Sequence, residues 1–274
     1  MPNEGIHRFT LNLNLPRLNR LKANSALCGY IKYIQNLRKL KRSIAYGEPR
    51  SMPGSAKNFG KSRPILNEFL SAAGTASGHY FHQDLLVANY IFQNKPKVHL
   101  DIGSRIDGFI AHLLSFDQKI TLGDIRPVEF DNTNISFIRM DLSSELNLSL
   151  LGRYESISCL HAIEHIGLGR YGDPVNAMGH YIALKNLGSL LSSSGTLYLS
   201  YPFGIESRIE YNAHRVISLA ESCDMFYLNK LAVRKFAYVN DDGNLVNVRN
   251  IADIDWEYSY HQKYGCAIWV LHKE

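Results

Sequence analysis

A short apolar run that ends in Asp101 passes through a glycine-containing turn directly into a second apolar run. The turn, residues 102–108, holds Gly103 and Gly108, and glycines allow a backbone to turn sharply and to lie close to a ligand. The first run has the length of a buried strand, and the second, at 109–114, belongs to a helical pattern. Because strand, turn and helix follow one another in this way, the sequence predicts an α/β fold.

Strands and helices alternate along most of the remaining chain. Short strands separated by helices indicate βαβ units, and therefore a mainly parallel sheet that is buried on both faces. Two later β-prone runs, 226–239 and 266–271, have no helix between them and predict an antiparallel pair at one edge. The expected strands are 97–102, 119–125, 135–140, 156–161 and 196–201, and the expected helices are 80–93, 107–115, 176–191 and 214–223.

The composition, with 45% hydrophobic and 20% charged residues in a chain of 274, is typical of a soluble globular protein with one main domain. The sequence has neither an apolar stretch of about eighteen residues nor a secretory signal, so a cytoplasmic location is expected. The cysteines are scattered singly, which favours free thiols over disulfides or a zinc site. They are Cys28, Cys159, Cys223 and Cys266.

Residues 1–67 are predicted to form a basic extension and linker ahead of a domain at 68–274. They hold thirteen Lys or Arg and two acids, a net +11, whereas the whole chain is +5, so the remaining residues sum to −6. Residues 18–44 have the pattern of a basic amphipathic helix, and residues 46–64 have the composition of a linker. Several roles are open for the extension: a solvated tail, packing against its own domain or a second subunit, or peripheral docking on an anionic membrane, glycolipid or nucleic acid.

Aspartates follow three successive predicted strands, at Asp101, Asp124 and Asp141. Because open parallel sheets bind ligands at the carboxyl ends of their strands, these side chains are expected at one site. Such acids would repel a dinucleotide pyrophosphate, whereas they favour the ammonium, the sulfonium and the ribose hydroxyls of S-adenosylmethionine. The acids predict a methyl-donor site, although an aspartate after a strand is also a common helix cap or turn residue.

From about residue 79 to about residue 273, the pattern resembles the class I methyltransferase fold, a Rossmann-like sheet that is mainly parallel and ends in an antiparallel strand. Five segments also resemble a family of uncharacterised proteins, the domain-of-unknown-function 268 family. These segments are 78–84, 101–108, 124–127, 159–174 and 212–215. The resemblance implies a methyltransferase-like domain but no defined substrate.

The resemblance also implies which residues contact the cofactor. Asp101 and Gly103 are expected to meet the methionine moiety. Asp124 is expected to bridge the ribose hydroxyls, and Asp141 with Leu142 to lie beside the adenine. The turn after the first strand lacks the third close glycine of most methyltransferases, so a variant geometry is expected there. The complete predicted cofactor set is Asp101, Gly103, Ser104, Gly108, Asp124, Ile125, Asp141, Leu142, His82 and Gln83.

Methyl transfer from a sulfonium is an in-line displacement, so the protein must mainly align the acceptor and, for a hydroxyl acceptor, remove its proton. Histidine suits proton removal near neutral pH. His165, just past the fourth strand, and His214, after the fifth, are the candidate bases. Glu164 is a candidate to orient the base or to hold the methionine ammonium. The alternative is that these histidines only fix loops by hydrogen bonding and that Glu164 only starts a helix.

Arg170, Tyr171 and Arg215 are predicted to contact the acceptor, since a guanidinium binds phosphate or carboxylate bidentately; the alternative is a pair with a local acid such as Asp173. No metal site is predicted, because the chain lacks the His-x-x-x-His and Cys-x-x-Cys spacings. The leading function is S-adenosylmethionine-dependent O-methylation of a sugar, glycan or other small polar acceptor. The alternatives are a non-catalytic module that docks on an anionic surface and, less favoured, a nucleic-acid methyltransferase. The oligomeric state is left open.

Overall fold

A computed structural model gives the architecture of the chain and describes residues 15–46, 60–69, 71–103 and 106–274. The chain divides into two compact units, Met1–Thr75 and Ala76–Glu274, which are described separately below. The cavity and the candidate site residues all belong to the second unit. The domain boundary after residue 67 stays a prediction.

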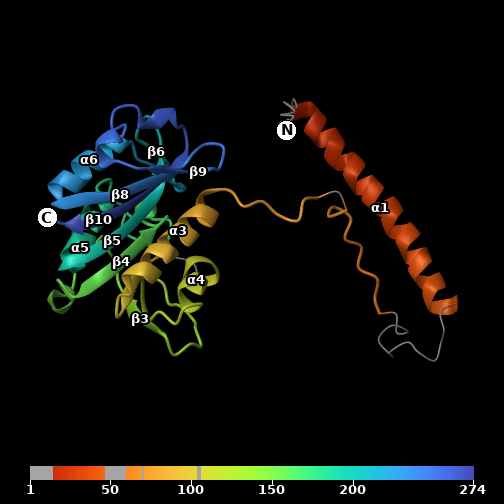
Figure 1. The fold of residues 1–274 in the computed structure, drawn as a ribbon, viewed down its shortest axis with the longest axis horizontal. Helices are drawn as coiled ribbons and strands as arrows, with labels where there is room; N and C mark the ends of the chain where they lie inside the picture. The colour runs from red at the N-terminus through yellow and green to blue at the C-terminus, as the bar shows by residue number, and fades with distance from the viewer. Residues whose placement is uncertain (1–14, 47–59, 70, 104–105) are drawn as a thin grey trace, which may run out of the picture. The chain divides into compact units, whose positions relative to one another are not determined.

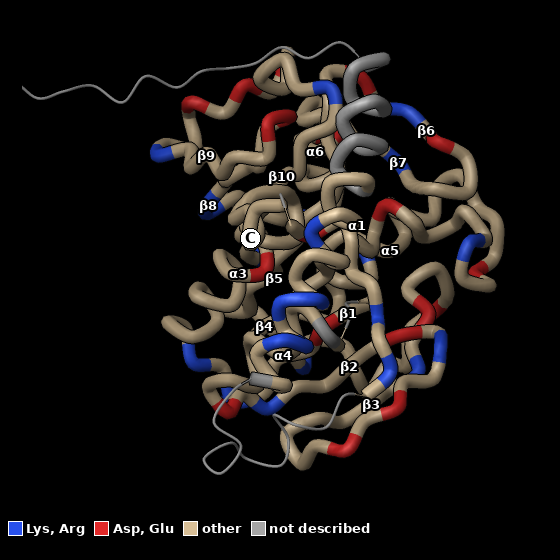
Figure 2. The backbone as a smooth tube through the Cα atoms, turned by 90° about the vertical axis from the view of Figure 1, so that its right-hand side faces the viewer, with Lys and Arg blue, Asp and Glu red and all other residues tan. Residues whose placement is uncertain are grey.

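The first unit contains a long helix, α1 (Leu15–Tyr46), which includes the basic helix predicted at 18–44. The sequence of α1 holds Lys and Arg but neither Asp nor Glu, and the blue positions along α1 in Figure 2 mark these basic residues. The linker predicted at 46–64 lies mostly outside the described residues. None of the helices in the described ranges is long and apolar enough to cross a bilayer. Docking of α1 on an anionic surface stays a prediction.

An eight-stranded sheet forms the centre of the second unit, in the order β3-β2-β1-β4-β5-β10-β8-β9. The strands from β3 to β5 run parallel. β10 runs antiparallel to both β5 and β8, and β9 runs antiparallel to β8. The prediction of a Rossmann-like, mainly parallel sheet with an antiparallel final strand is confirmed. The strands are β1 (His99–Ile102), β2 (Ile120–Asp124), β3 (Ile135–Arg139), β4 (Tyr154–Leu160), β5 (Leu191–Phe203), β8 (Leu231–Val239), β9 (Leu245–Val248) and β10 (Gly265–Lys273).

Helices cover both faces of this sheet (Figure 1). α3 and α4 share one buried apolar cluster with the sheet, and α5 and α6 share another. The alternation of side chains along β10 assigns Ile268 to the first cluster and Trp269 to the second. Both side chains are at most 1% exposed, as expected for a strand with a helical layer on each face. The helices are α3 (His79–Asn94), α4 (Ala111–Leu114), α5 (Gly179–Leu190) and α6 (Leu219–Leu228).

The structure corrects the helix predicted at 214–223. Its first residues form a strand, β7 (His214–Val216), which pairs antiparallel with β6 (Arg208–Glu210), and α6 begins only after them. The side chain of Ser218 accepts a hydrogen bond from the backbone N–H of Glu221 at the start of α6. In the sequence, this Ser-x-x-Glu pattern indicates a helix start at Ser218. The prediction followed the periodicity of apolar residues instead and placed the start four residues too early.

The helix predicted at 107–115 is interrupted rather than continuous. A π-helical turn, η1 (Ile106–Ile110), precedes the short α4. Gly108 lies inside this turn with φ −118° and ψ −110°, which is not a helical conformation. This turn lies between β1 and α4, and Gly108 itself lines the cavity.

Candidate functional site

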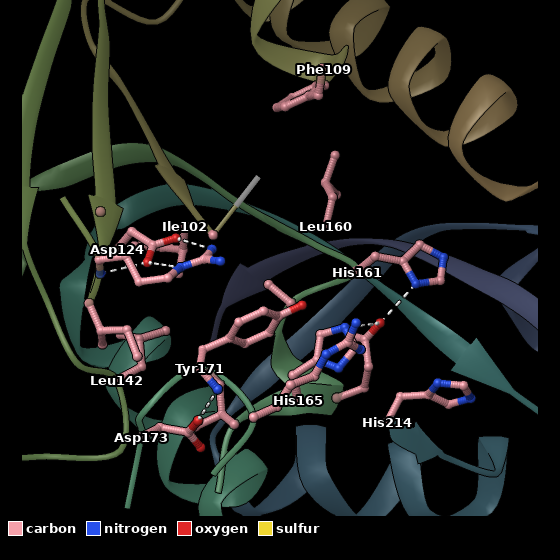
Figure 3. Close-up of a pocket in the computed structure, with 18 of the residues that line it drawn as sticks. Ile102, Phe109, Asp124, Leu142, Leu160, His161, His165, Tyr171, Asp173 and His214 are labelled. Carbon is pink, nitrogen blue, oxygen red and sulfur yellow. Dashed lines mark hydrogen bonds and ion pairs between the residues drawn. The ribbon is translucent and has the colours of Figure 1, made fainter. Parts of the chain in front are cut away.

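A cavity of about 590 Å³ opens at the carboxyl ends of the parallel strands, the edge at which open α/β sheets bind their ligands. Figure 3 shows Tyr171 between a side formed by Asp124 and Leu142 and a side formed by His161, His165 and His214. The predicted residues that line the cavity are Gln83, Gly103, Gly108, Asp124, Ile125, Asp141, Leu142, Glu164, His165, Arg170, Tyr171 and His214.

The remaining predicted site residues are placed elsewhere. Ser104 lies outside the described residues. His82 is half-buried on α3 and is not part of the cavity lining. Asp101 and Arg215 are 1% and 3% exposed, and neither is part of the lining. Both are engaged by groups inside the protein, and their predicted ligand contacts stay predictions.

Asp101 is held by a hydrogen-bonded network inside the sheet. The Ser158 hydroxyl donates to the Asp101 carboxylate, and the two ring nitrogens of His99 lie 2.7 Å from the hydroxyls of Ser156 and Ser158. Because Ser158 donates to Asp101, it accepts from Nε2–H of His99, so Nδ1 accepts from Ser156. Burial lowers the pKa of His99 to about 3, in agreement with a neutral ring. The carboxylate of Asp101 is therefore part of a polar network that joins β1 to β4.

Gly103 forms the turn directly after β1. Its φ is 72°, in the left-handed region. A Cβ atom at this position would lie 2.9 Å from the Cβ of Ala162, in the loop after β4. Only glycine combines this conformation with such a close approach between two loops. The turn therefore brings the ends of β1 and β4 together at the cavity.

Asp124 ends β2 and faces the cavity together with Arg126. The Arg126 Nε and Nη2 atoms donate to the two carboxylate oxygens of Asp124 at 3.1 and 3.0 Å, and the backbone N–H of Arg126 donates to Oδ1 at 2.8 Å. The guanidinium also lies 4.4 Å from the centre of the Tyr171 ring. Hydrogen bonding to Asp124 raises the pKa of Arg126. The Asp124 side chain is 11% exposed, whereas that of Arg126 is 51% exposed, so Arg126 has room to move aside.

Asp141 follows β3 and is fixed by a turn. Its Oδ1 accepts from the backbone N–H and the hydroxyl of Ser143, and its Oδ2 accepts from the hydroxyl of Ser144. Burial by itself raises the pKa of Asp141, but these hydrogen bonds lower it overall. Met140 and Leu142, on either side of Asp141, give the cavity an apolar wall here.

The loop after β4 is organised around Asp173. One carboxylate oxygen accepts from the backbone N–H groups of Gly167 and Gly169 at 2.6 and 3.2 Å, and the other accepts from Tyr171 at 3.2 Å. Gly167 has φ 85°, and a Cβ there would lie 2.2 Å from the carbonyl oxygen of Asn176. Asp173 therefore holds the loop by its backbone, and the guanidinium of Arg170 donates instead to the carbonyl oxygen of Ala213 at 2.9 Å.

Arg215 packs under the same loop. Its Nη1 donates to the carbonyl oxygens of Glu164 and Ile166 at 3.3 and 2.7 Å, and its Nη2 donates to those of Asn176 and Ala177 at 3.3 Å each. Burial lowers the pKa of Arg215. Four carbonyl oxygens thus occupy a guanidinium that the sequence suggested for acceptor binding.

His165 presents one ring nitrogen to the protein and keeps the other available. Its Nδ1 lies 2.7 Å from the carbonyl oxygen of Ala213. A carbonyl only accepts, so Nδ1 carries the proton and the lone pair of the neutral ring is on Nε2. Nε2 lies 3.8 Å from Oε1 of Glu164. Burial lowers the pKa of His165 more than Glu164 raises it, so the ring is neutral near pH 7 and can accept a proton.

Glu164 lies at the centre of the polar side of the cavity and is 1% exposed. Its Oε1 lies 2.8 Å from Nδ1 of His161, and its Oε2 is buried with no hydrogen-bond partner among the described residues. Burial alone lowers the pKa of His161, but Cys266 and Glu164 raise it well above its usual value. A buried carboxylate oxygen without a donor is costly unless a ligand supplies one. Glu164 therefore suits a cationic or hydrogen-bond-donating ligand.

His214, the second candidate base, begins β7. Its Nε2 lies 3.3 Å from Oε2 of Glu210, without hydrogen-bond geometry. The His214 ring is 6.4 Å from that of His165, measured between centroids. The structure thus brings both candidate bases to one side of the cavity.

Sequence reasoning missed several lining residues. Arg126 and His161 belong to two of the segments that resemble the domain-of-unknown-function 268 family. They were not predicted, because the carboxylates in those segments were chosen as the candidate residues. Tyr264 has no local signal. It lies just before β10, and only the antiparallel direction of this strand brings its start to the edge where the parallel strands end.

Residues 112–232 match the family model described as "Caenorhabditis protein of unknown function, DUF268". The match confirms the resemblance to the domain-of-unknown-function 268 family. It extends from α4 to the beginning of β8 and includes the loop after β4 with Glu164 and His165. No curated protein matches the chain.

Solved structures similar to this chain include methyltransferases of low identity. Burkholderia thailandensis 1,6-didemethyltoxoflavin-N1-methyltransferase with bound S-adenosylhomocysteine is 13% identical, with 70% of this chain and 79% of that chain covered and a TM-score of 0.48. A putative methyltransferase in complex with the Haloferax volcanii Trm112 activator is 13% identical, with 71% and 89% covered and a TM-score of 0.47. A SAM-dependent methyltransferase of Leishmania major is 12% identical, with 69% and 72% covered and a TM-score of 0.47.

Proposed function

We propose that this chain, which matches the DUF268 family over residues 112–232, is an S-adenosylmethionine-dependent methyltransferase. The observation that carries the proposal is the acidic cavity at the carboxyl edge of the parallel sheet, lined by Asp124, Asp141 and Glu164 from the ends of three strands. Its volume of about 590 Å³ is within the range of roughly 300–1,000 Å³ for small-molecule sites. Carboxylates suit a ligand with an ammonium, a sulfonium and a ribose diol, and they disfavour a pyrophosphate.

The donor set of the cavity fits this cofactor. The unpartnered Oε2 of Glu164 is available to the methionine ammonium, a role the sequence suggested for Asp101 as well. Asp124 is available to the ribose hydroxyls once Arg126 moves aside. Met140 and Leu142 offer an apolar wall to the adenine. The bound cofactor would supply the activated methyl group and a neutral thioether as leaving group.

In the proposed reaction His165 acts as general base. Its Nε2 lone pair accepts the proton of an acceptor hydroxyl. Nδ1–H keeps its hydrogen bond to the Ala213 carbonyl oxygen, so the ring remains oriented during the transfer. Arg170 and Tyr171 lie beside His165 in the lining and can hold a polar acceptor. These hydrogen-bonding and aromatic side chains favour a sugar, glycan or similar small polar molecule as the acceptor class.

The proposal is tested by titration calorimetry with S-adenosylhomocysteine on the full chain, followed by transfer of labelled methyl groups to separate carbohydrate and nucleic-acid fractions. We expect binding and labelled carbohydrate. The absence of S-adenosylhomocysteine binding at millimolar concentration would contradict both the proposed cofactor site and the proposed activity. Label found on nucleic acid alone would refute the sugar acceptor while leaving the methyltransferase in place.

The Asp124–Arg126 pair favours a second candidate, a non-catalytic module that keeps the fold without the cofactor. In this case Arg126 would occupy the Asp124 carboxylate permanently. The same titration separates the two candidates, because a permanent pair leaves no acceptor for the ribose hydroxyls. Absence of S-adenosylhomocysteine binding would favour the module, and binding would contradict it.

Asp124→Asn is expected to weaken S-adenosylhomocysteine binding about 10- to 100-fold, since a hydrogen bond to a charged group contributes about 1.5–3 kcal/mol. The matched control is Arg126→Gln, which frees the Asp124 carboxylate from its competitor. This control should bind at least as tightly as the unaltered chain. Calorimetry measures both affinities. Equal affinity in Asp124→Asn and the unaltered chain would contradict the ribose assignment.

A further inference from the structure

Three residues from distant parts of the sequence place nitrogen and sulfur donors together beside the cavity. They are His79 at the start of α3, His161 just after β4, and Cys266 near the start of β10. One ring nitrogen of each histidine and the Sγ atom of Cys266 all lie within 4.8 Å of one another. The two imidazole rings are stacked, with centroids 5.3 Å apart. Cys266 is fully buried and is a free thiol.

His161 is oriented in the way that metal-binding histidines usually are. Its Nδ1 lies 2.8 Å from the Glu164 carboxylate, so Nδ1–H donates to Glu164 and an ion at Nε2 would displace the second ring proton. The side chain is 5% exposed, and Nε2 is buried without a hydrogen-bond partner in the described part of the chain. In Figure 3 a dashed line leaves one ring nitrogen of His161, and the other ring nitrogen is turned away from that line. A carboxylate behind a histidine fixes the ring and strengthens it as a ligand.

We propose that His79, His161 and Cys266 bind a divalent thiophilic ion of the Zn²⁺ class, with Glu164 as the positioning carboxylate behind His161. Two imidazoles and a thiolate select such an ion over Mg²⁺ or Ca²⁺, which take oxygen ligands. A dication beside one thiolate and one carboxylate is also locally neutral. This removes the cost of burying those two groups as separate charges.

To bind one ion, the three donor atoms must move closer together than they are in the structure. Tetrahedral zinc with bonds of about 2.0 Å to nitrogen and about 2.3 Å to sulfur holds two nitrogens and one sulfur about 3.3–3.5 Å apart. The donors here are within 4.8 Å, and His79, in the first turn of α3, is half-buried. Its ring would have to turn out of its stack with His161 to direct a nitrogen at the same ion. Three protein ligands leave a fourth position for water or for an oxygen, nitrogen or sulfur atom of a substrate. Because His161 also lines the cavity, that position belongs to its margin.

The His-x-x-x-His and Cys-x-x-Cys patterns did not detect these three residues, because such patterns apply to ligands close together in sequence and no two of these residues share an element. The crossover between β4 and β5 and the reversed direction of β10 bring them to the same edge of the sheet. The prediction of no metal site rested on local spacing alone. It stays a prediction, and the metal titration below decides between it and this cluster.

The test uses the full chain without a histidine tag, stripped with a chelator and titrated with Co²⁺ in the absence of any methyl donor, so that its failure is separate from failure of the proposed function. We expect one Co²⁺ per chain and a thiolate-to-cobalt charge-transfer absorption. Cys266→Ser should lose this absorption, whereas Cys223→Ser, which alters an exposed thiol on α6, should keep it. Glu164→Gln should weaken Co²⁺ binding about 10- to 100-fold, as expected for a carboxylate behind a metal ligand.

A second measurement guards against misfolding of Cys266→Ser. In the unaltered chain, Zn²⁺ should slow alkylation of Cys266 at least tenfold, as followed by mass spectrometry, while alkylation of Cys223 stays unchanged. The proposal is overturned if the unaltered chain binds less than about one tenth of a Co²⁺ ion per chain and shows no thiolate-to-cobalt absorption. It is also overturned if this absorption survives in Cys266→Ser. Alkylation of Cys266 at the same rate with and without Zn²⁺ would leave a simple Cys266–His161 pair and also overturn it.

Discussion

His165→Gln is expected to lower kcat for methyl transfer to a hydroxyl acceptor by about 10²- to 10⁴-fold, the usual contribution of a positioned general base. Glutamine can keep the hydrogen bond to the Ala213 carbonyl through its amide, but it offers no basic nitrogen to the acceptor. KM for the acceptor should change much less than kcat. Steady-state kinetics with labelled S-adenosylmethionine measures both.

The pH profile identifies the base. Burial lowers the pKa of His165, Arg170 and His161 lower it further, and Glu164 and the Ala213 carbonyl raise it in part. The ring is therefore protonated and inactive only at acidic pH, and kcat should rise with pH through an apparent pKa below 6.5 to a plateau near neutrality. His214 and Tyr171 face the same ring from neighbouring segments.

His165→Gln should remove the acidic limb of this profile along with most of the rate. His112→Gln is the control, since His112, on α4, lies outside the cavity lining and belongs to no predicted site. It should leave kcat within about twofold, as expected of a substitution away from the site. If the acidic limb persists in His165→Gln and disappears in His214→Gln, the base is His214 and the assignment to His165 is wrong.

Arg215→Met is expected to lower the free energy of unfolding by about 3–5 kcal/mol, because it leaves buried carbonyl oxygens without donors. The four oxygens belong to the segments 164–166 and 176–177, which border the loop that carries Tyr171. Urea denaturation measures the change. The exposed Arg170 is the control, and Arg170→Met should cost about 0.5 kcal/mol or less.

The same pair of variants decides between two roles for Arg215. In the structural role, Arg215→Met lowers stability, and the surviving folded protein has a near-normal KM for the acceptor. In the role that the sequence suggested, the variant unfolds at the same urea concentration as the unaltered chain, and KM rises. The second outcome would contradict the geometry of four carbonyl contacts.

The sequence predicted the sheet better than the site. Buried parallel strands such as β1 and β4 are continuous apolar runs, and this pattern is local, so their positions could be predicted. The side-chain direction at a strand end is not local. Asp101 and Asp124 occupy equivalent places after β1 and β2, yet the first is engaged by Ser158 of the neighbouring strand and the second faces the cavity.

Arg215 and Tyr264 show the same limit. Arg215 lies in a segment whose motif was recognised, but the carbonyl oxygens around its guanidinium come from a loop some forty to fifty positions earlier. Tyr264 and Cys266 belong to no motif, and their place depends on the direction of β10. Such contacts follow from chain topology and packing, which periodicity and spacing do not encode.

The position of β10 has a consequence for how the protein is built. β10 lies between β5 and β8 in the sheet. The hairpin of β8 and β9 therefore cannot join the rest of the sheet until residues 265–273 have been synthesised and have paired with both β5 and β8. The pairing of β5 with β10 joins residues far apart in sequence, which makes it a slow step of folding. A chain interrupted before Gly265 would lose the interior of its sheet and not merely its edge.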